Sequence, residues 1–234
     1  MNKKVAIVVG GTGFIGREIV IELSKREYTV ICISKSSNIP QFPVNNIVSI
    51  CCNMTVHSNI QRIIGNIIAE YKSIDVLINV IGKNINVPLN DIDEIIWDEV
   101  IDTNVKSIFF TCRAVGNEMV KNGEGSIINF ASTAGIRSDP ESPHYIVAKA
   151  GVIALTKYFA RLYAPNIRVN CIAPGFVLTD NHKKENYPRY NEVINKIPIK
   201  QMVPICEIVK STMYLVDSQN ITGHTLVIDG GLIL

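Results

Sequence analysis

Tyr145 and Lys149, with three residues between them, are the side chains whose types and spacing point most directly to chemistry. Ser142 and Pro143 before them are typical of a helix N-cap and first helical position, so we expect a helix from here towards residue 163. Residues four apart share one helix face, and an ammonium beside a phenol favours the phenolate. Each unit by which Lys149 lowers the pKa of Tyr145 corresponds to about 1.4 kcal/mol. The pair therefore predicts a tyrosine that acts as a general acid and base.

Ser132, thirteen residues upstream of Tyr145, offers a hydroxyl to the same candidate site. It follows residues 126–131, an apolar run typical of a buried strand. Sheets of the doubly wound type bind their ligands at the carboxyl ends of their strands, which is where Ser132 would lie. A tyrosine and a lysine at this spacing also occur by chance on many helices, so the catalytic interpretation depends on the rest of the chain.

A glycine-rich loop near the amino terminus supplies a second candidate site. Residues 5–9 form an apolar run typical of a strand buried on both faces, and residues 17–25 have the apolar spacing of a helix. Between them, Gly10, Gly13 and Gly16 lie in the sequence Gly-Gly-Thr-Gly-Phe-Ile-Gly. A strand, a glycine turn and a helix in this order are typical of a dinucleotide-binding unit, in which the helix N-terminus faces the pyrophosphate. An ordinary tight turn is the alternative.

The remaining apolar runs alternate between strand and helix patterns. Further strands are expected at residues 29–34, 48–52, 76–79, 126–131, 167–173 and 225–228, and further helices at 58–71, 91–103, 105–121 and 204–216. Such alternation implies parallel strands joined by right-handed crossovers. We therefore expect an α/β fold, a doubly wound (Rossmann) seven-stranded parallel sheet with helices on both faces, as one domain over residues 1–234.

Composition limits the classes of partner. The 234 residues are 47% hydrophobic and 19% charged, with a net charge of +2, and contain no basic run that would indicate nucleic acid binding. The six cysteines show no CxxC spacing, so we expect reduced core residues and no metal site. Glycines interrupt the only apolar run near the amino terminus, and no apolar run has the length of a membrane span. We expect a cytoplasmic enzyme that acts on small molecules.

The motifs together resemble the short-chain dehydrogenase/reductase family, whose hallmark is a Tyr-x-x-x-Lys pair with a serine upstream. Asn79 and Gly82 match two of four residues of its motif after the fourth strand, and the Asp-Gly-Gly at 229–231 resembles its closing motif. The glycine loop departs from the single-domain branch, since Val9 stands for a threonine and Phe14 for the middle glycine. Its Gly-x-x-Gly-x-x-Gly spacing looks like that of the larger, epimerase-like branch.

The resemblance implies reversible hydride transfer between a nicotinamide cofactor and a carbonyl or secondary alcohol. Its four active-site residues would be Asn104, Ser132, Tyr145 and Lys149. In relatives the serine and tyrosine hydrogen-bond the carbonyl oxygen, and the tyrosine donates its proton. The lysine also binds the nicotinamide ribose, and the asparagine holds a water that links the lysine to solvent. A structural asparagine between two helices is the alternative for Asn104.

The end of the second expected strand bears on the choice of cofactor. Folds that prefer NAD usually place a carboxylate there, whereas a 2′-phosphate favours its absence and a nearby cation. Here Ser34 occupies that position and Lys35 follows it, so we predict NADP(H), with NAD(H) as the alternative. The motifs and the resemblance imply cofactor contacts from Gly10, Thr12, Gly13, Phe14, Ile15, Gly16, Ser34, Lys35, Asn53, Met54, Asn79, Gly82, Tyr145, Lys149, Pro174, Gly175, Val177 and Thr179.

The substrate is less determined than the reaction. The overall pattern most resembles 3-oxoacyl-(acyl-carrier-protein) reductases, which makes a thioester-linked ketone one candidate substrate. Gly123 and Pro165, however, lie where carrier-binding relatives often have basic residues. A small anionic or sugar-like carbonyl compound could instead meet Arg137, His144 and the lysines of the polar segment 180–198, a candidate lid. A cofactor-binding sensor without turnover is the third alternative.

The resemblance and two apolar segments also predict a homo-oligomer, specifically a tetramer. The segments are the expected helix at 105–120 and the carboxy-terminal tail at 232–234, which a monomer would expose.

Overall fold

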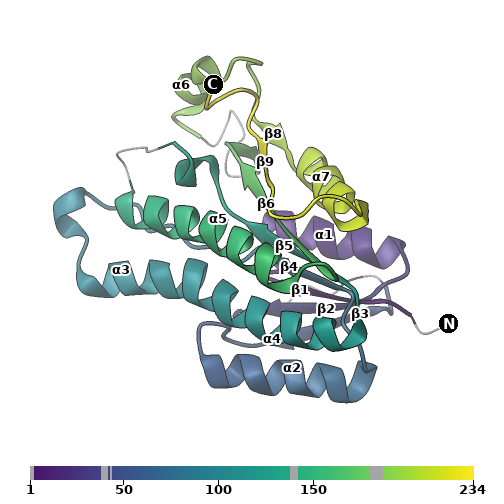
Figure 1. The fold of residues 1–234 in the computed structure, drawn as a ribbon. Helices are drawn as coiled ribbons and strands as arrows, with labels where there is room; N and C mark the ends of the chain where they lie inside the picture. Colours follow the sequence, from purple (N-terminus) through teal and green to yellow (C-terminus); the bar gives the residue numbers. More distant parts are fainter. Residues whose placement is uncertain (1–2, 38–41, 43, 138–141, 180–186) are drawn as a thin grey trace.

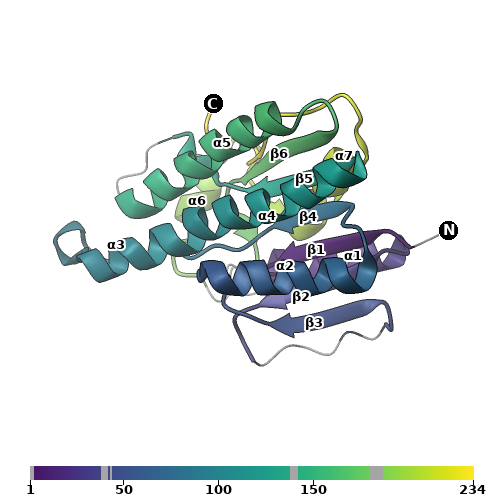
Figure 2. The same ribbon diagram turned by 60° about the horizontal axis from the view of Figure 1, so that its bottom comes forward.

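The computed structural model describes residues 3–37, 42, 44–137, 142–179 and 187–234. Its centre is a sheet of seven parallel strands (Figure 1 and Figure 2). In chain order these strands are β1 (Val5–Val9), β2 (Thr29–Ser34), β3 (Ile47–Cys51), β4 (Val76–Asn79), β5 (Gly125–Phe130), β6 (Ile167–Pro174) and β9 (Thr225–Ile228). They pair in the order β3-β2-β1-β4-β5-β6-β9, which confirms the expected doubly wound sheet.

Helices cover both faces of the sheet. On one face lie α1 (Phe14–Lys25) and α7 (Ile205–Asp217), which contact each other. On the other lie α2 (His57–Tyr71), α4 (Ser107–Asn122) and α5 (Pro143–Tyr163), which Figure 2 shows in front of the strands. The two helix layers enclose two separate hydrophobic clusters, one on each side of the sheet.

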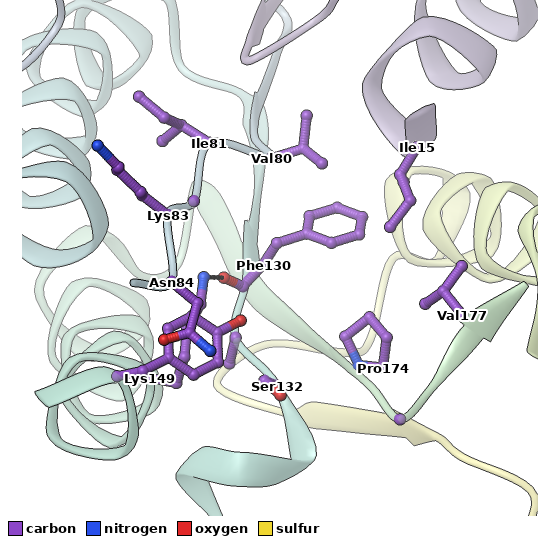
Figure 3. Close-up of a pocket in the computed structure, with 14 residues that line it drawn as sticks. Ile15, Val80, Ile81, Lys83, Asn84, Phe130, Ser132, Lys149, Pro174 and Val177 are labelled. Atoms are coloured by element: carbon purple, nitrogen blue, oxygen red, sulfur yellow. Dashed lines mark hydrogen bonds between the residues drawn. The ribbon is translucent and has the colours of Figure 1, made fainter. Parts of the chain in front are cut away.

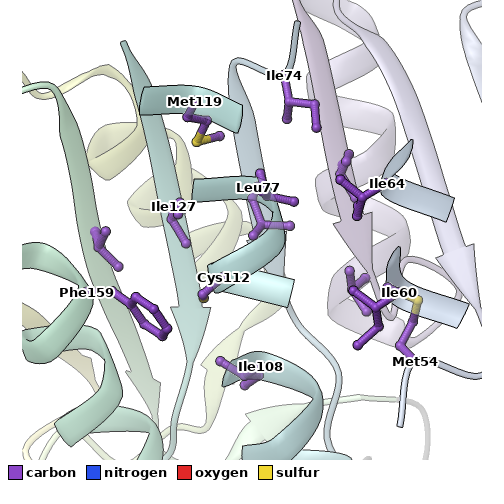
Figure 4. Close-up of a cluster of buried hydrophobic side chains, with 14 of the residues drawn as sticks. Met54, Ile60, Ile64, Ile74, Leu77, Ile108, Cys112, Met119, Ile127 and Phe159 are labelled. Carbon is purple, nitrogen blue, oxygen red and sulfur yellow. The ribbon is translucent and has the colours of Figure 1, made fainter. Parts of the chain in front are cut away.

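The first strand shows why the apolar runs form this sheet. Side chains alternate across a strand, and those of Val5, Ile7 and Val9 join the cluster beneath α2 and α4, whereas Ala6 and Val8 join the cluster beneath α1 and α7. A strand covered on both faces needs apolar residues at every position, as the sequence of β1 has. Figure 4 shows the larger cluster, in which Ile108, Cys112 and Met119 of α4 lie near Leu77 of β4 and Ile127 of β5, and Ile60 and Ile64 of α2 lie further along the sheet.

Strand boundaries agree with the sequence-based expectation to within one residue, whereas the first helix begins earlier than expected. α1 starts at Phe14 and not at residue 17. Gly13 is its extended N-cap residue, and Gly16 in the first turn packs closely on the loop, since a Cβ atom there would lie 2.9 Å from Gly11 Cα. The glycine loop therefore runs directly into the first helical turn.

The two helices expected at 91–103 and 105–121 form one nearly continuous path. A short 3₁₀ turn (Leu89–Asp91) precedes α3 (Glu94–Ile101), and a π-helical turn (Asp102–Lys106) joins α3 to α4. Asp93 caps α3, because its Oδ1 accepts a hydrogen bond of 2.8 Å from the backbone N–H of Ile96. The expected break at residue 104 is thus a π turn, a feature often found at functional sites.

The polar segment 180–198, expected to be a lid, contains the short helix α6 (Tyr190–Lys196), and its residues 180–186 lie outside the described part of the chain. Two strands of two residues, β7 (Val177–Leu178) and β8 (Val203–Pro204), pair beside it. They were not expected, because two residues are too few to show a strand pattern.

The cysteines are all free. Four of them are buried, as expected for core residues, whereas Cys51 and Cys206 are exposed. Within the described ranges no cluster of potential metal ligands occurs, and no helix there has the length and apolar character to cross a membrane.

Two helical glycines provide a matched test of how tightly α4 and α5 pack. A Cβ atom on Gly116 would lie 2.5 Å from Cζ of the buried Tyr163 ring, whereas one on Gly65 in α2 would meet nothing within 4 Å. We expect Gly116→Ala to lower the free energy of unfolding by about 1–3 kcal/mol through overpacking. Gly65→Ala should raise it by about 0.5–1 kcal/mol, because alanine favours helix. Urea unfolding measures both, and a stabilised Gly116→Ala would contradict this packing.

Candidate active site

The carboxyl ends of the central strands open into a pocket of about 240 Å³ (Figure 3). Its lining comes from five segments: Ile15 of α1; Val80, Ile81, Gly82, Lys83 and Asn84 after β4; Phe130, Ala131 and Ser132 at the end of β5; Tyr145 and Lys149 of α5; and Pro174, Gly175 and Val177 after β6. Three of the four residues expected at the active site therefore line one pocket.

Lys149 is buried at the base of the pocket with 3% of its surface exposed. Its Nζ donates a hydrogen bond of 2.9 Å to the backbone carbonyl of Phe130 and lies 5.5 Å from the centroid of the Tyr145 ring. Tyr145 and Lys149 therefore lie on one face of α5, as expected. Burial disfavours the charged form and lowers the pKa of Lys149 to about 8.

The pKa of Tyr145 differs from the sequence-based expectation. Burial raises it above its ordinary value, and a hydrogen bond with Ser132, not the charge of Lys149, acts in the lowering direction. The physical reason is geometric. The ammonium of Lys149 lies near the ring of Tyr145 and donates its hydrogen bond to the backbone carbonyl of Phe130, so it does not pair with the phenol oxygen. The side chain that favours the ionised form of Tyr145 is therefore Ser132 and not Lys149.

Close packing of the turn after β5 delivers Ser132 to Tyr145. Ser132 caps the 3₁₀ turn Thr133–Gly135, since its Oγ accepts a hydrogen bond of 3.2 Å from the N–H of Ala134. A Cβ atom on Gly135 would lie 2.6 Å from the backbone carbon of Lys149. Only glycine lets this turn rest on α5, which fixes the hydroxyl beside the helix.

Asn104 is fully buried in the π turn behind the pocket. Its Nδ2 donates to the carbonyls of Lys83 at 2.7 Å and Val100 at 2.8 Å, and its Oδ1 accepts from the N–H of Lys83 at 3.3 Å. A Cβ atom on Gly82 would lie 3.1 Å from both Asn104 Oδ1 and Lys149 Nζ. Asn104 therefore holds the segment after β4, and it borders the same narrow space as Lys149.

The glycine loop has the form of an anion site. Gly10 has a φ of +88°, and a Cβ atom there would lie 2.8 Å from the backbone nitrogen of Ile81. Gly13 is the N-cap of α1 and provides no side-chain cap, so the N–H groups of the first turn, Phe14 to Gly16, keep their capacity to bind an anion. Thr12 Oγ1 lies 2.7 Å from Ser34 Oγ, which ties the loop to the end of β2. These residues fit the pyrophosphate of a dinucleotide.

The edge formed by β2 and β3 contains the residues expected to contact the adenosine part of the cofactor. Lys35 is exposed, and Ser34 Oγ accepts from the N–H of Ser36 at 3.3 Å. Asn53 Oδ1 accepts from the N–H of Thr55 at 3.1 Å and so shapes the turn after β3. Met54 is 2% exposed, and its side chain packs in the core.

On the other side of the pocket, Pro174, Gly175 and Val177 line the wall as expected. A Cβ atom on Gly175 would lie 2.7 Å from Cβ of Asp229, so the Asp-Gly-Gly motif packs directly beneath this loop. Thr179 is the last described residue before the segment 180–186 and is not among the residues that line the pocket.

Several expected residues lie elsewhere. Asn79 is fully buried, and its Nδ2 donates to Asn129 Oδ1 at 2.9 Å, so it supports the sheet from beneath α4 and does not reach the pocket. His144 is also fully buried, with Nε2 2.9 Å from the carbonyl of Ile85, which excludes it as a solvated ligand for an anion. Arg137 donates to the carbonyl of Leu232 at 2.9 Å.

Sequence reasoning missed other lining residues, namely Val80, Ile81, Lys83, Asn84, Phe130 and Ala131. Their position at the carboxyl ends of two central strands was the available signal.

Substituting Lys149 by methionine tests the burial of its ammonium. Below about pH 8 the lysine is protonated in both states, and between about pH 8 and 10.5 the folded state has released a proton that the unfolded state still binds. Stability rises with pH in that window. We expect the wild type to gain up to about 3 kcal/mol relative to Lys149→Met across it. Urea unfolding at several pH values measures the difference in free energy of unfolding between the two proteins. Titratable groups that both proteins share contribute equally and cancel in this difference. A difference that does not change with pH would contradict the burial.

Comparison with known proteins gives two kinds of similarity. Residues 4–189 match the family model described as short chain dehydrogenase. Among curated relatives, a 3-oxoacyl-[acyl-carrier-protein] reductase FabG of Chlamydia trachomatis is 40% identical over 170 residues, which are 71% of this chain and 68% of that protein. The FabG of Staphylococcus epidermidis is 31% identical over 243 aligned residues, covering 99% of each chain.

Solved structures extend the similarity to the whole fold. ElxO with NADP bound has a TM-score of 0.92 and 27% identity, and the match covers 99% of each chain. A short chain dehydrogenase from Leptospira borgpetersenii with bound NAD⁺ also has a TM-score of 0.92, with 29% identity, and the match covers 100% of this chain and 94% of the other. The sheet order, the glycine loop, the Tyr-x-x-x-Lys helix and these matches lead to one conclusion: the chain belongs to the short-chain dehydrogenase family.

Proposed function

We propose that the protein is an NADP(H)-dependent reductase that interconverts a ketone and a secondary alcohol, with a 3-oxoacyl thioester as its substrate. The observation that carries the proposal is that Ser132, Tyr145 and the buried Lys149 line one pocket at the carboxyl ends of the central strands. The thioester follows from the activity for which the FabG relatives are named. Family membership supports the reaction class, oxidoreduction between C=O and CH–OH.

The proposed roles follow from the polar atoms of the pocket. Ser132 Oγ and the Tyr145 hydroxyl hydrogen-bond the substrate carbonyl oxygen, and Tyr145 transfers its proton to that oxygen as the carbon is reduced. When bound, the nicotinamide supplies the hydride, so that one hydride and one proton convert the ketone to the alcohol. Lys149, whose ammonium lies beside the Tyr145 ring, binds the nicotinamide ribose. Asn104 borders the same narrow space as Lys149. It helps to connect Lys149 to solvent, from which the proton that Tyr145 gives up is replaced.

The proposed cofactor contacts follow the shape of the site. The N–H groups at the start of α1 bind the pyrophosphate, while Gly10 and Gly16 let the backbone approach it. Exposed Lys35 and the hydroxyl of Ser34 bind the 2′-phosphate. The remaining proposed contacts are the turn at Asn53 and Met54, Gly82 after β4, and Pro174, Gly175, Val177 and Thr179 after β6.

We also propose that the protein acts in the cytoplasm as a homotetramer. The apolar side chains of α4 that motivated an oligomer are mostly core residues, including Ile108, Val115 and Met119. The outer face of α5 gives a better reason, because Tyr158 and Leu162 are 56% and 54% exposed one turn apart. Light scattering should give about four times the chain mass of 25.9 kDa, and a monomer at micromolar concentration would contradict the proposal.

Replacing Tyr145 by phenylalanine removes the proton donor and keeps the ring. We expect turnover to fall by about two or more orders of magnitude, with the fold and NADPH affinity unchanged, because a positioned general acid contributes on this scale. Steady-state kinetics and NADPH fluorescence titration measure the two effects. Tyr214→Phe on α7, where the tyrosine is 58% exposed, is the matched control and should behave as wild type. Near-normal turnover in Tyr145→Phe would remove the proposed role.

Replacing Ser34 by aspartate should shift cofactor preference from NADPH towards NADH. The new carboxylate repels a 2′-phosphate and accepts a hydrogen bond from a 2′-hydroxyl. The ratio of kcat/KM for the two cofactors measures the shift, and Ser37→Asp, three residues along the same segment, controls for added charge alone. A wild type that already prefers NADH would show that the charge argument is wrong.

A further inference from the structure

The segment after β4, residues 82–86, is held from two sides. On one side, Asn104 binds both the N–H and the carbonyl of Lys83 at 3.3 and 2.7 Å. On the other, His144 at the start of α5 binds the carbonyl of Ile85 at 2.9 Å. Because the chain is fixed at 83 and again at 85, the residue between them has a determined position.

That residue is Asn84, and its side chain faces the catalytic groups. It lines the pocket together with Ser132, Tyr145 and Lys149. Figure 3 draws Asn84, Ser132 and Lys149 at one end of the pocket, away from Ile15 and Val177 on the right. Asn84 is exposed, and no hydrogen bond from its carboxamide is found within the described ranges. An amide can donate two hydrogen bonds and accept others, so this held backbone segment presents a polar side chain with unused hydrogen-bonding capacity.

The charged groups nearby are already paired or buried. Lys83 forms an ion pair of 2.5 Å with Glu99 on α3, and Lys149 donates to the carbonyl of Phe130. Among the described residues that line this end of the pocket, the side-chain polar atoms that remain to meet a substrate are the hydroxyls of Ser132 and Tyr145 and the amide of Asn84. This set of atoms suits a neutral hydrogen-bonding group more than an anion.

We propose that Asn84 is a specificity-determining residue that donates a hydrogen bond to a second carbonyl of the substrate, next to the carbonyl that is reduced. Ser132 and Tyr145 bind the reacting oxygen, and the amide of Asn84, at the same end of the pocket, binds the neighbouring one. A 3-oxoacyl thioester has such a pair of carbonyls, separated by one carbon. The inference rests on the proposed ketoreductase function and narrows its substrate to neutral compounds with two carbonyls.

The test compares two substrates in Asn84→Leu and the wild type. One substrate is the N-acetylcysteamine thioester of acetoacetate, and the other is 2-heptanone, a ketone with no second carbonyl. We expect Asn84→Leu to lower kcat/KM for the thioester by about tenfold, since one hydrogen bond to a buried carbonyl is lost. For 2-heptanone it should change less than about twofold. NADPH affinity, followed by fluorescence, should not change, and Asn90→Leu, exposed on the neighbouring 3₁₀ turn outside the pocket, should match the wild type.

Each other outcome contradicts a defined part of the account. Equal losses for both substrates, or no loss for the thioester, would overturn the role of Asn84 while the reductase function stands. A wild type that reduces 2-heptanone at least as well as the thioester would also overturn the role of Asn84. A wild type that binds NADPH and reduces neither compound would overturn the proposed function and the inference with it.

Discussion

The buried ammonium of Lys149 is the constraint on which the arrangement of this site depends. A charged group removed from water must find a partner, and here the carbonyl of Phe130 accepts a hydrogen bond of 2.9 Å from the ammonium. Phe130 is the last residue of β5, so this hydrogen bond ties α5 to the carboxyl end of the sheet. Burial also brings the pKa of Lys149 down to about 8, close to the range useful for proton transfer.

Two glycines let neighbouring segments approach that ammonium. Because Gly82 has no side chain, it fits closely against both Asn104 and Lys149. Gly135 lets the turn that begins at Ser132 pack on the backbone of α5. The result is that segments from β4, β5 and α5, far apart in the sequence, meet in one pocket. The close approach that glycine allows at these two positions brings polar groups together at one site.

The sequence was most informative where a local pattern determines the structure. Apolar runs located every strand of the main sheet to within one residue, and the Tyr-x-x-x-Lys spacing located Tyr145 and Lys149 on one helix face. What it missed depends on contacts through space. The burial that raises the pKa of Tyr145, the Asn104 hydrogen bonds and the pocket position of Asn84 come from segments packed together by the fold. No periodicity within one segment encodes them.

The central claim is that this pocket transfers a hydride and a proton to a ketone, and a single-turnover experiment tests it most directly. Stoichiometric NADPH is mixed with the protein and a 3-oxoacyl thioester, while NADPH absorbance is followed and the products are identified by mass spectrometry. The account predicts one 3-hydroxyacyl thioester formed for each NADPH consumed. Bound NADPH that persists unchanged beside the thioester would contradict it and would favour a protein that binds the cofactor without turnover.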